Sequence, residues 1–473
     1  MNDTIVRMSH IEIKNFKNVG CGHLEFENSK KGYRANILGI YGQNGSGKTA
    51  LIDALELLRL ALSGRALPAY FADYINVESE YATLKYGFRV KSEQEHCTYS
   101  VFYDVSIRRE RDEDAHNTEI PVSEEKSKAV IFDEVLSYAY EYNGKKTRLS
   151  PVIDTRRDGD VAFTPASKYQ LLIGRDKEVS TRLLVARQLA RATSRSFIFS
   201  RELLHAIRQN CKEACHRFLF DSLVFFGNFQ LSVINTVHTG LISMNALPIA
   251  FNYAGSSNNS AVGNILINLN APSIIPKDAL DIVRKTIECM NIVLSRLVPG
   301  LIIGIKDMGM QLYSNGTTGY RIQLLSCKNS KEIPLQYESE GIKKLISILQ
   351  LLIVVYNKPS MTVAIDELDS GVFEYLLGEM LRILAEKGKG QLVFTSHNLR
   401  PLETLDKCFI AFTTTNSQNR YIRMSNVKNT NNLRDFYYRD IVLGEQSESV
   451  YDWTNNSEIA MAFSEAGEGG NDA

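Results

Sequence analysis

Apolar and polar residues alternate along much of the N-terminal third, with the two-residue period of β-strands. A short apolar run over 37–41 predicts a buried strand, and apolar residues at helical spacing predict a helix over 49–62. The charged stretch 108–128 predicts an exposed loop. The alternating segments predict strands over 5–27, a hairpin over 83–107, and strands over 129–150 with Asn143-Gly144 as the turn.

The pattern changes twice further along the chain. Helical spacing dominates from 166 to 300, and strands resume after Gly300 with Asn315-Gly316 as a hairpin turn. A helix, a strand, a helix and a strand then follow over 341–356, 361–365, 372–386 and 391–395, a rhythm typical of an α/β parallel core. We therefore predict an α/β fold with a mixed sheet. Its units are an N-terminal lobe (1–165), a mainly helical insertion (166–300) and a C-terminal lobe (301–473) with a disordered tail from about 464.

Charge and composition exclude several classes of protein. The 473 residues carry 54 Lys+Arg and 54 Asp+Glu, so a globally basic nucleic-acid-binding coat is excluded. The longest apolar run, Leu345 to Tyr356, is too short to cross a membrane. Seven scattered cysteines do not form a disulfide framework, and the first residues do not resemble a signal peptide. We expect a cytoplasmic, reduced protein.

A phosphate-binding loop stands between the strand predicted at 37–41 and the helix after it. Residues 42–49, Gly-Gln-Asn-Gly-Ser-Gly-Lys-Thr, fit G-x-x-x-x-G-K-[ST]. Glycines let the backbone N–H groups turn inward around phosphates, and a helix N-terminus adds positive potential. Lys48 is expected to bind the β- and γ-phosphates, and Thr49 to hold Mg²⁺. The cofactor-binding residues expected from the loop are Gly42, Asn44, Gly45, Ser46, Gly47, Lys48 and Thr49.

Two later strands end in polar residues. The strand at 361–365 is followed by Asp366, expected to hold Mg²⁺ through water, and Glu367, expected to act as general base. The strand at 391–395 is followed by Ser396 and His397, which is expected to report the γ-phosphate. Parallel strands would deliver all of these residues to the edge that carries the phosphate loop.

A short motif precedes the long apolar helix. In Glu338-Ser339-Glu340-Gly341, Ser339 is a plausible N-cap and Gly341 allows close backbone approach. Taken alone, these two residues favour a plain helix cap over a phosphate-binding helix N-terminus.

The order of these motifs resembles the ABC-type ATPase head of the SMC, RecF and OLD-like branch. The opening residues 11–18, Ile-Glu-Ile-Lys-Asn-Phe-Lys-Asn, also resemble the first strand of such heads. The resemblance covers roughly 1–165 and 300–430. It implies ATP and Mg²⁺ as cofactors and two heads that pair around the nucleotide, as a dimer or a higher oligomer built of dimers.

The resemblance also assigns roles to further residues. Ser339 and Gly341 would be the signature motif, acting on the nucleotide of a partner, and Asp369 would be the D-loop aspartate. Glu-Ser-Glu-Gly lacks one glycine of Leu-Ser-Gly-Gly. Gln170 and Gln188 are both candidates for the Q-loop glutamine.

The insertion carries two features outside this pattern. Residues 171–217 hold ten Lys/Arg and four Asp/Glu, and a candidate nucleic-acid face near one side of a helix comprises Arg182, Arg187, Arg191 and Arg195. The alternative, a solvated face with local ion pairs, is favoured because no aromatic residues interleave with these arginines. Cys211, Cys215 and His216, with His205 upstream, suggest zinc, but a structural cysteine pair on one helix face is favoured because no second pair lies at zinc-site spacing.

The overall plan resembles the ATPase subunits of the Septu and PARIS anti-phage systems. No nuclease motif follows His397, so the nuclease effector is expected on a separate chain, with a phage protein as trigger. The principal hypothesis is thus an ATP-hydrolysing switch subunit that holds such an effector. The alternatives are a RecF-like ATPase that binds DNA in repair and an ATP-bound scaffold with little turnover.

Overall fold

The computed structural model describes residues 4–27, 36–92, 97–111, 127–142, 145–157, 159–254, 260–312, 318–425, 432–444 and 446–468. Both predicted Asn-Gly turns and most of the charged stretch 108–128 lie outside these residues. None of the helices described is long and apolar enough to cross a membrane.

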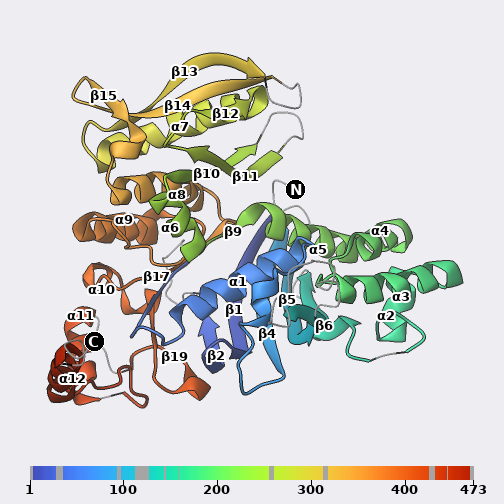
Figure 1. Cartoon of the computed structure of the whole chain (residues 1–473). Coiled ribbons are helices and arrows are strands. Elements are labelled where there is room, and N and C mark those ends of the chain that lie inside the picture. Colours follow the sequence, from blue (N-terminus) through green and yellow to red (C-terminus); the bar gives the residue numbers. More distant parts are fainter. Residues whose placement is uncertain are drawn as a thin grey trace.

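A mixed six-stranded sheet forms the centre of the molecule (Figure 1). Its order is β19 (Tyr421–Ile422), β18 (Ile410–Thr413), β3 (Asn36–Tyr41), β17 (Gln391–Thr395), β16 (Thr362–Ile365) and β9 (Leu231–Ile234). All pairs are parallel except β18–β19. The strands are short and apolar because helices and a second sheet cover both faces. The predicted α/β fold class is confirmed.

A seven-stranded antiparallel sheet forms the N-terminal lobe. It contains β1 (Thr4–Phe16), β2 (Val19–Glu25), β4 (Tyr81–Ser92), β5 (Cys97–Arg111), β6 (Ser127–Tyr142), β7 (Lys145–Lys146) and β8 (Ser150–Asp154). The predicted hairpin is β4–β5, paired from Tyr81↔Arg108 to Ser92↔Cys97. A single-turn helix, η1 (Ala69–Ala72), precedes β4.

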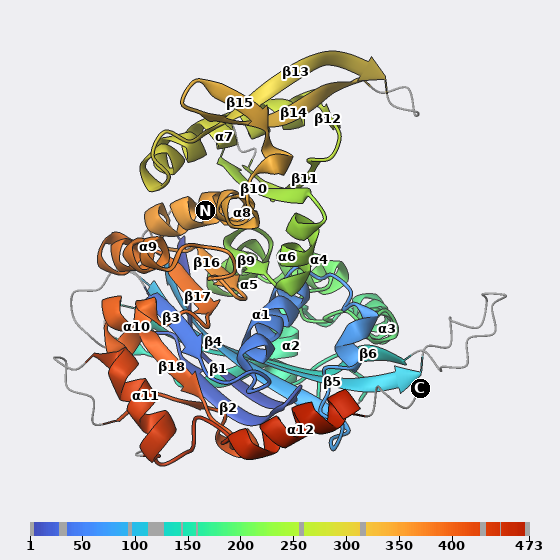
Figure 2. The ribbon, with the colours of Figure 1, turned by 60° about the vertical axis from the view of Figure 1, so that its left-hand side comes forward.

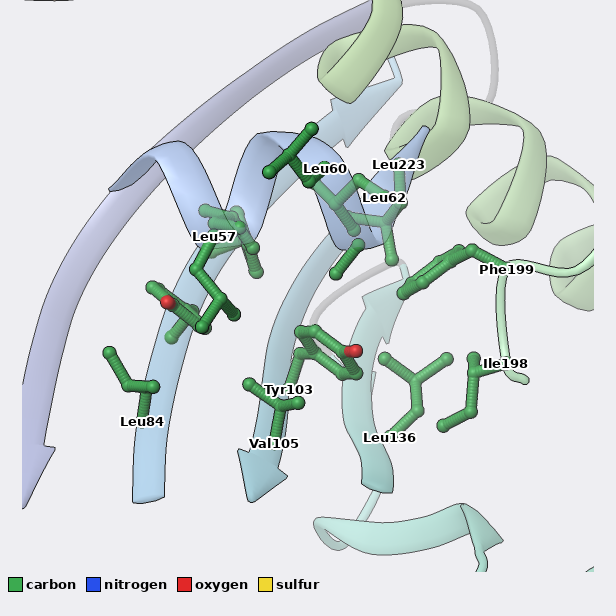
Figure 3. Close-up of a cluster of buried hydrophobic side chains, with 14 of the residues drawn as sticks. Leu57, Leu60, Leu62, Leu84, Tyr103, Val105, Leu136, Ile198, Phe199 and Leu223 are labelled. Atoms are coloured by element: carbon green, nitrogen blue, oxygen red, sulfur yellow. The ribbon is translucent and has the colours of Figure 1, made fainter. Parts of the chain in front are cut away.

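Helix α1 (Lys48–Leu62) lies between the two sheets, which explains why almost all of its residues are buried. Figure 3 shows leucines of α1 packed against β4, β5 and β6 on one side and, on the other, against α5 (Ala214–Phe225) and the residues just before α4 (Arg201–Asn210). The labelled side chains are Leu57, Leu60, Leu62, Leu84, Tyr103, Val105, Leu136, Ile198, Phe199 and Leu223. This packing fixes the first residues of α1, and with them the phosphate loop.

The described part of the stretch 166–300 contains six helices and four strands. Helices α2 (Ala166–Leu172) and α3 (Lys177–Ala192) lead to α4 and α5, which continues through a π-turn, η3 (Phe226–Gln230), into β9. Helix α6 (Thr236–Ser243) and strands β10 (Ala246–Ala254), β11 (Ser260–Asn268) and β12 (Ser273–Pro276) then lead to α7 (Lys277–Leu297). The four strands within this mainly helical stretch were not expected from the sequence, because short apolar runs do not separate strand from helix by periodicity.

The rest of the C-terminal part adds a small sheet and five helices. Strands β13 (Ile302–Leu312), β14 (Thr318–Lys328) and β15 (Lys331–Pro334) join β12, so the insertion and the C-terminal lobe share one sheet. The helices are α8 (Glu340–Asn357), α9 (Glu374–Lys387), α10 (Arg400–Thr404), α11 (Leu433–Leu443) and α12 (Asn456–Glu468), with single turns η4 (Leu335–Tyr337), η5 (Lys407–Phe409) and η6 (Ser417–Asn419). Figures 1 and 2 show the small sheet above α8. Residues 464–468, expected to be disordered, belong to α12, whereas 469–473 lie outside the described residues.

Candidate functional site: a phosphate loop and an acidic strand end

The phosphate loop connects β3 to α1 through three glycines with positive φ. Gly42, Gly45 and Gly47 have φ of 151°, 76° and 96°, a region that side chains with a Cβ rarely adopt. At Gly42 a Cβ would also lie 1.8 Å from Thr413 Oγ1. The loop conformation thus depends on glycine. Asn44 and Gly45 are exposed at its tip, and Thr49 is half-buried in the first turn of α1.

Lys48 folds back over the loop. Its Nζ donates to the main-chain oxygens of Gly42 and Gln43, both at 2.9 Å, and the residue is only 7 % exposed. Burial lowers the pKa of Lys48, while the nearby carboxylates of Asp366, Glu367 and Asp369 act in the opposite direction. A buried ammonium within a glycine-rich loop has the charge that a phosphate-binding site requires.

Residues distant in the sequence support the loop from outside. Tyr421 Oη donates to Gly47 O at 2.9 Å, Asn18 Nδ2 donates to Gly45 O, and Arg420 donates to Asn18 O at 2.6 Å. The supporting residues Asn18, Arg420 and Tyr421 were not recognised from the sequence. No spacing rule links them to the loop, because β1–β2 and β18–β19 reach it only through the fold.

The acidic strand end is organised by a threonine from the next strand. Thr395 Oγ1, at the end of β17, donates to Asp366 Oδ1 at 2.5 Å and accepts the N–H of Glu367 at 2.7 Å. Asp366 is 1 % exposed, and its Oδ2 has no hydrogen-bond partner in the structure. A buried carboxylate oxygen left free fits a water-mediated Mg²⁺ ligand, with Thr49 on the neighbouring helix as the second predicted ligand.

Glu367 leaves the strand in the left-handed region, with φ of 48°. A glutamate there carries backbone strain, and the hydrogen bond from its N–H to Thr395 offsets part of it. Its side chain is half-buried. The residue therefore turns away from the line of the strand, at the edge where β3 delivers the phosphate loop.

Asp369 and His397 are joined through the backbone. Asp369 Oδ2 accepts the N–H groups of His397 at 3.1 Å and of Asn398 at 2.9 Å, whereas its buried Oδ1 has no hydrogen-bond partner. His397 is exposed. The predicted D-loop aspartate thus holds the turn that carries the predicted switch histidine. The structure brings these residues to one edge, as parallel pairing of β3, β17 and β16 requires.

Ser339 and Gly341 start helix α8 on the surface of the C-terminal lobe. Ser339 Oγ accepts the N–H of Ile342 at 3.3 Å, so the residue is a helix N-cap, and it is exposed. A Cβ on Gly341 would lie 1.8 Å from Gly371 O. The glycine therefore permits close contact between the start of α8 and the loop after Asp369.

Lys344, one turn into α8, is a site neighbour that was not singled out from the sequence. It is 2 % exposed, and its Nζ donates to Thr239 Oγ1 of α6 at 2.8 Å. Burial lowers its pKa, and the carboxylates of Glu367, Asp366 and Asp369 oppose the shift. Helix α8 thus contributes a second buried cation near the acidic strand end.

The arginine face predicted in the insertion is only partly available. Arg187 donates to the main-chain oxygens of Thr155 and Arg157, and Arg191 pairs with Glu110 at 3.1 Å. Arg182 is exposed on α3, and Arg195 lies beyond the end of that helix. The local ion pairs of the alternative interpretation are thus present.

The two candidates for the Q-loop glutamine are not among the residues that contact the phosphate loop in the contacts described above. Gln170 belongs to α2, where its Oε1 accepts from Arg175 at 3.3 Å, and Gln188 belongs to α3. Neither is among the residues whose described hydrogen bonds reach the phosphate loop.

Comparison with known proteins gives one family match and several distant structural ones. Residues 10–192, which include the phosphate loop, match a model of an AAA domain. No curated protein sequence matches. The chain is similar to an SMC head bound to the C-terminal winged-helix domain of ScpA, with 14 % identity, 89 % of this chain and 98 % of that chain covered, and a TM-score of 0.40.

Two further solved structures are similar at the same distance. The SMC head domain from Thermotoga maritima shares 14 % identity, with 89 % and 99 % of the two chains covered and a TM-score of 0.36. The recombination mediator RecF from the RecFOR pathway shares 13 %, with 89 % and 99 % covered and a TM-score of 0.35.

The contact at Gly341 gives a prediction about stability. Replacing a glycine inside a helix by alanine normally stabilises by about 0.5–1 kcal/mol. Gly341→Ala should instead lower the free energy of unfolding by about 1–3 kcal/mol, because its methyl group meets the Gly371 backbone. Urea unfolding measures the difference. Gly240→Ala in α6, where nothing lies within 4 Å of the added Cβ, is the matched control and should be neutral or stabilising. Equal behaviour of the two variants would contradict the close contact.

Proposed function

We propose that the protein binds ATP with Mg²⁺ at the phosphate loop and hydrolyses it to ADP and phosphate. One observation carries this proposal: three parallel neighbours, β3, β17 and β16, end together and present Lys48, the Thr395–Asp366 pair and Glu367 at one edge. Brought together, these residues supply a phosphate cradle, a free metal-binding oxygen and a carboxylate base, the parts that phosphoryl transfer to water requires.

Each residue has a task that its geometry supports. Lys48 and the loop N–H groups neutralise the β- and γ-phosphates, and the ion itself, once held by Thr49 and by Asp366 through water, would neutralise charge on the phosphate oxygens. Glu367 accepts the proton of the attacking water. His397, exposed on the turn that Asp369 holds, would donate a hydrogen bond to the γ-phosphate of bound ATP.

The nucleotide site is completed by a second copy of the chain in this proposal. The start of α8 is exposed, and the 18-residue helix places free N–H groups and positive potential at Ser339 and Gly341. Two heads related by a two-fold axis could each present this N-terminus to the γ-phosphate of the other. Pairing would then depend on the triphosphate, and hydrolysis would release the pair.

We further propose that nucleotide-dependent pairing holds or releases a separately encoded nuclease effector in anti-phage defence. Its support is the resemblance of the overall plan to the Septu and PARIS ATPase subunits. Co-purification tests this role. The chain should co-purify with the product of a neighbouring nuclease gene when ATP is present and should no longer do so with ADP. Salt-dependent DNA binding by the chain alone, lost on replacing Arg182, would instead favour the RecF-like role in repair.

The turnover step gives a second prediction. Glu367→Gln keeps the shape of the side chain but removes the base, so ATP should still bind while hydrolysis falls by about 10²–10⁴-fold. Phosphate release and equilibrium ATP binding are measured side by side. Lys48→Ala is the comparison variant, and it should weaken ATP binding itself by about 100-fold because a charged hydrogen-bond donor is lost. Unchanged phosphate release in Glu367→Gln would show that another group is the base.

Thr395 gives a third prediction. Thr395→Val preserves volume but leaves the N–H of Glu367 and one oxygen of Asp366 without a partner, at a cost of about 1–3 kcal/mol for each buried group. ATP turnover should fall by about tenfold or more. Thr395→Ser keeps the hydroxyl and should hydrolyse ATP at close to the wild-type rate. If valine and serine variants have the same rate, the hydroxyl does not position the acids.

The proposal that two copies of the chain share each ATP site gives a fourth prediction. Ser339→Arg places a bulky cation where the partner's phosphate is received, so this variant should bind ATP without hydrolysing it. Mixed with Lys48→Ala, it should regain activity, up to about half per mixed pair if the sites act independently, because one site in such a pair keeps both wild-type parts. Turnover that is independent of protein concentration, together with full activity of Ser339→Arg, would rule out a shared site.

A further inference from the structure

Three potential metal ligands meet where α4 joins α5, far along the chain from the phosphate loop. Ligand atoms of Glu213, Cys215 and His216 all lie within 4.8 Å of one another. His216 Nε2 is 3.0 Å from Glu213 Oε2, and Cys215 Sγ is 3.9 Å from the same oxygen. The sequence had favoured a plain cysteine pair on one helix face. Cys211 instead caps α4, and α5 starts at Ala214, so the two cysteines do not share a helix.

His216 is aimed into this cluster and held there. The residue is 3 % exposed, its Nδ1 is hydrogen-bonded to the Tyr138 hydroxyl of β6, and its buried Nε2 has no hydrogen-bond partner of acceptable geometry. In the tautomer with the proton on Nδ1, which the Tyr138 hydroxyl can accept, Nε2 presents a lone pair to the cluster, the usual arrangement of a metal-bound histidine and its outer partner.

We propose that Glu213, Cys215 and His216 form a zinc site, with water as the fourth ligand. Bond lengths of about 2.0–2.3 Å in a tetrahedron separate neighbouring ligand atoms by about 3.3–3.6 Å. The two separations in the structure, 3.0 and 3.9 Å, lie on either side of that range. A thiolate, an imidazole and one carboxylate favour Zn²⁺ over Mg²⁺ or Ca²⁺, which prefer all-oxygen sites. The thiol proton of Cys215 leaves to solvent on binding.

A zinc ion at this site would stabilise the segment that leads to β16, the strand that ends at Asp366. Glu213 and His216 lie at the first turn of α5, and Tyr138 belongs to the antiparallel sheet, so the ion would fix the start of α5 against β6 (Figure 1). Helix α5 continues through η3 into β9, which pairs with β16, the strand that ends at Asp366. The proposal does not depend on ATP hydrolysis, and its test does not measure it.

The experiment uses the full chain, freed of metal with a chelator and kept reduced. Titration with Co²⁺ should produce a thiolate-to-cobalt absorption band at about one equivalent, and Zn²⁺ should displace the cobalt. Cys215→Ser should remove the band. Tyr138→Phe should keep the band but weaken Zn²⁺ binding, measured against a competing chelator, by about 10–100-fold. Cys289→Ser, at an exposed cysteine of α7, is the matched control and should behave as wild type.

A variant at an exposed ligand removes the ambiguity of misfolding. The Glu213 side chain is exposed, so Glu213→Gln should fold normally yet weaken Zn²⁺ binding by about tenfold or more and lose the zinc-dependent rise in thermal unfolding temperature expected of wild type. The proposal is overturned if the wild-type chain gives no cobalt band, if Cys215→Ser keeps the band, or if Glu213→Gln binds zinc as wild type does. In each of those cases Glu213, Cys215 and His216 do not form the zinc site proposed here.

Discussion

The Thr395 hydroxyl is the interaction on which the acidic edge of the core sheet depends. It donates to Asp366 and accepts from the N–H of Glu367, so a side chain of β17 sets the geometry of two residues just beyond β16. Without it, the left-handed backbone of Glu367 would lose a hydrogen bond that offsets its strain, and a buried carboxylate oxygen would lose its donor. The parallel pairing of β16 with β17 places the hydroxyl there, which ties the chemistry of the site to the order of strands.

Charge balance is the second constraint. Lys48 and Lys344 are both buried, and burial lowers the pKa of each, so neither cation would be tolerated without the carboxylates of Asp366, Glu367 and Asp369 nearby. The cluster holds two cations and three acids before any phosphate arrives. A triphosphate would add several negative charges, and a divalent ion between it and the free oxygen of Asp366 would reduce that excess.

Sequence reasoning found those parts of the site that are local in the chain. The phosphate loop, the Asp-Glu strand end and the strand before His397 each carry a short pattern with a physical meaning, and the structure places them at one edge. It missed β9, because a four-residue segment with three apolar residues fits a strand or a helix equally well. It also missed Tyr421, which bonds the loop, Arg420, which bonds Asn18 beside it, and Lys344, which lies in the field of the acids, because only tertiary packing places these residues there.

The contact of Gly341 with Gly371 links the surface that would meet a partner to the centre of the site. Gly371 lies in the loop that carries Asp369, and Asp369 holds the backbone of His397 through its N–H. A displacement of the start of α8 would therefore push on the backbone of Gly371 and not on a flexible side chain. The carboxylate of Asp369 would then transmit it to the turn that carries His397. Because packed backbone yields little, the start of α8 and the His397 turn should move together or not at all. A partner's phosphate bound at Ser339 would thus bear on the histidine of this chain's own site, which is the connection that a two-site switch needs.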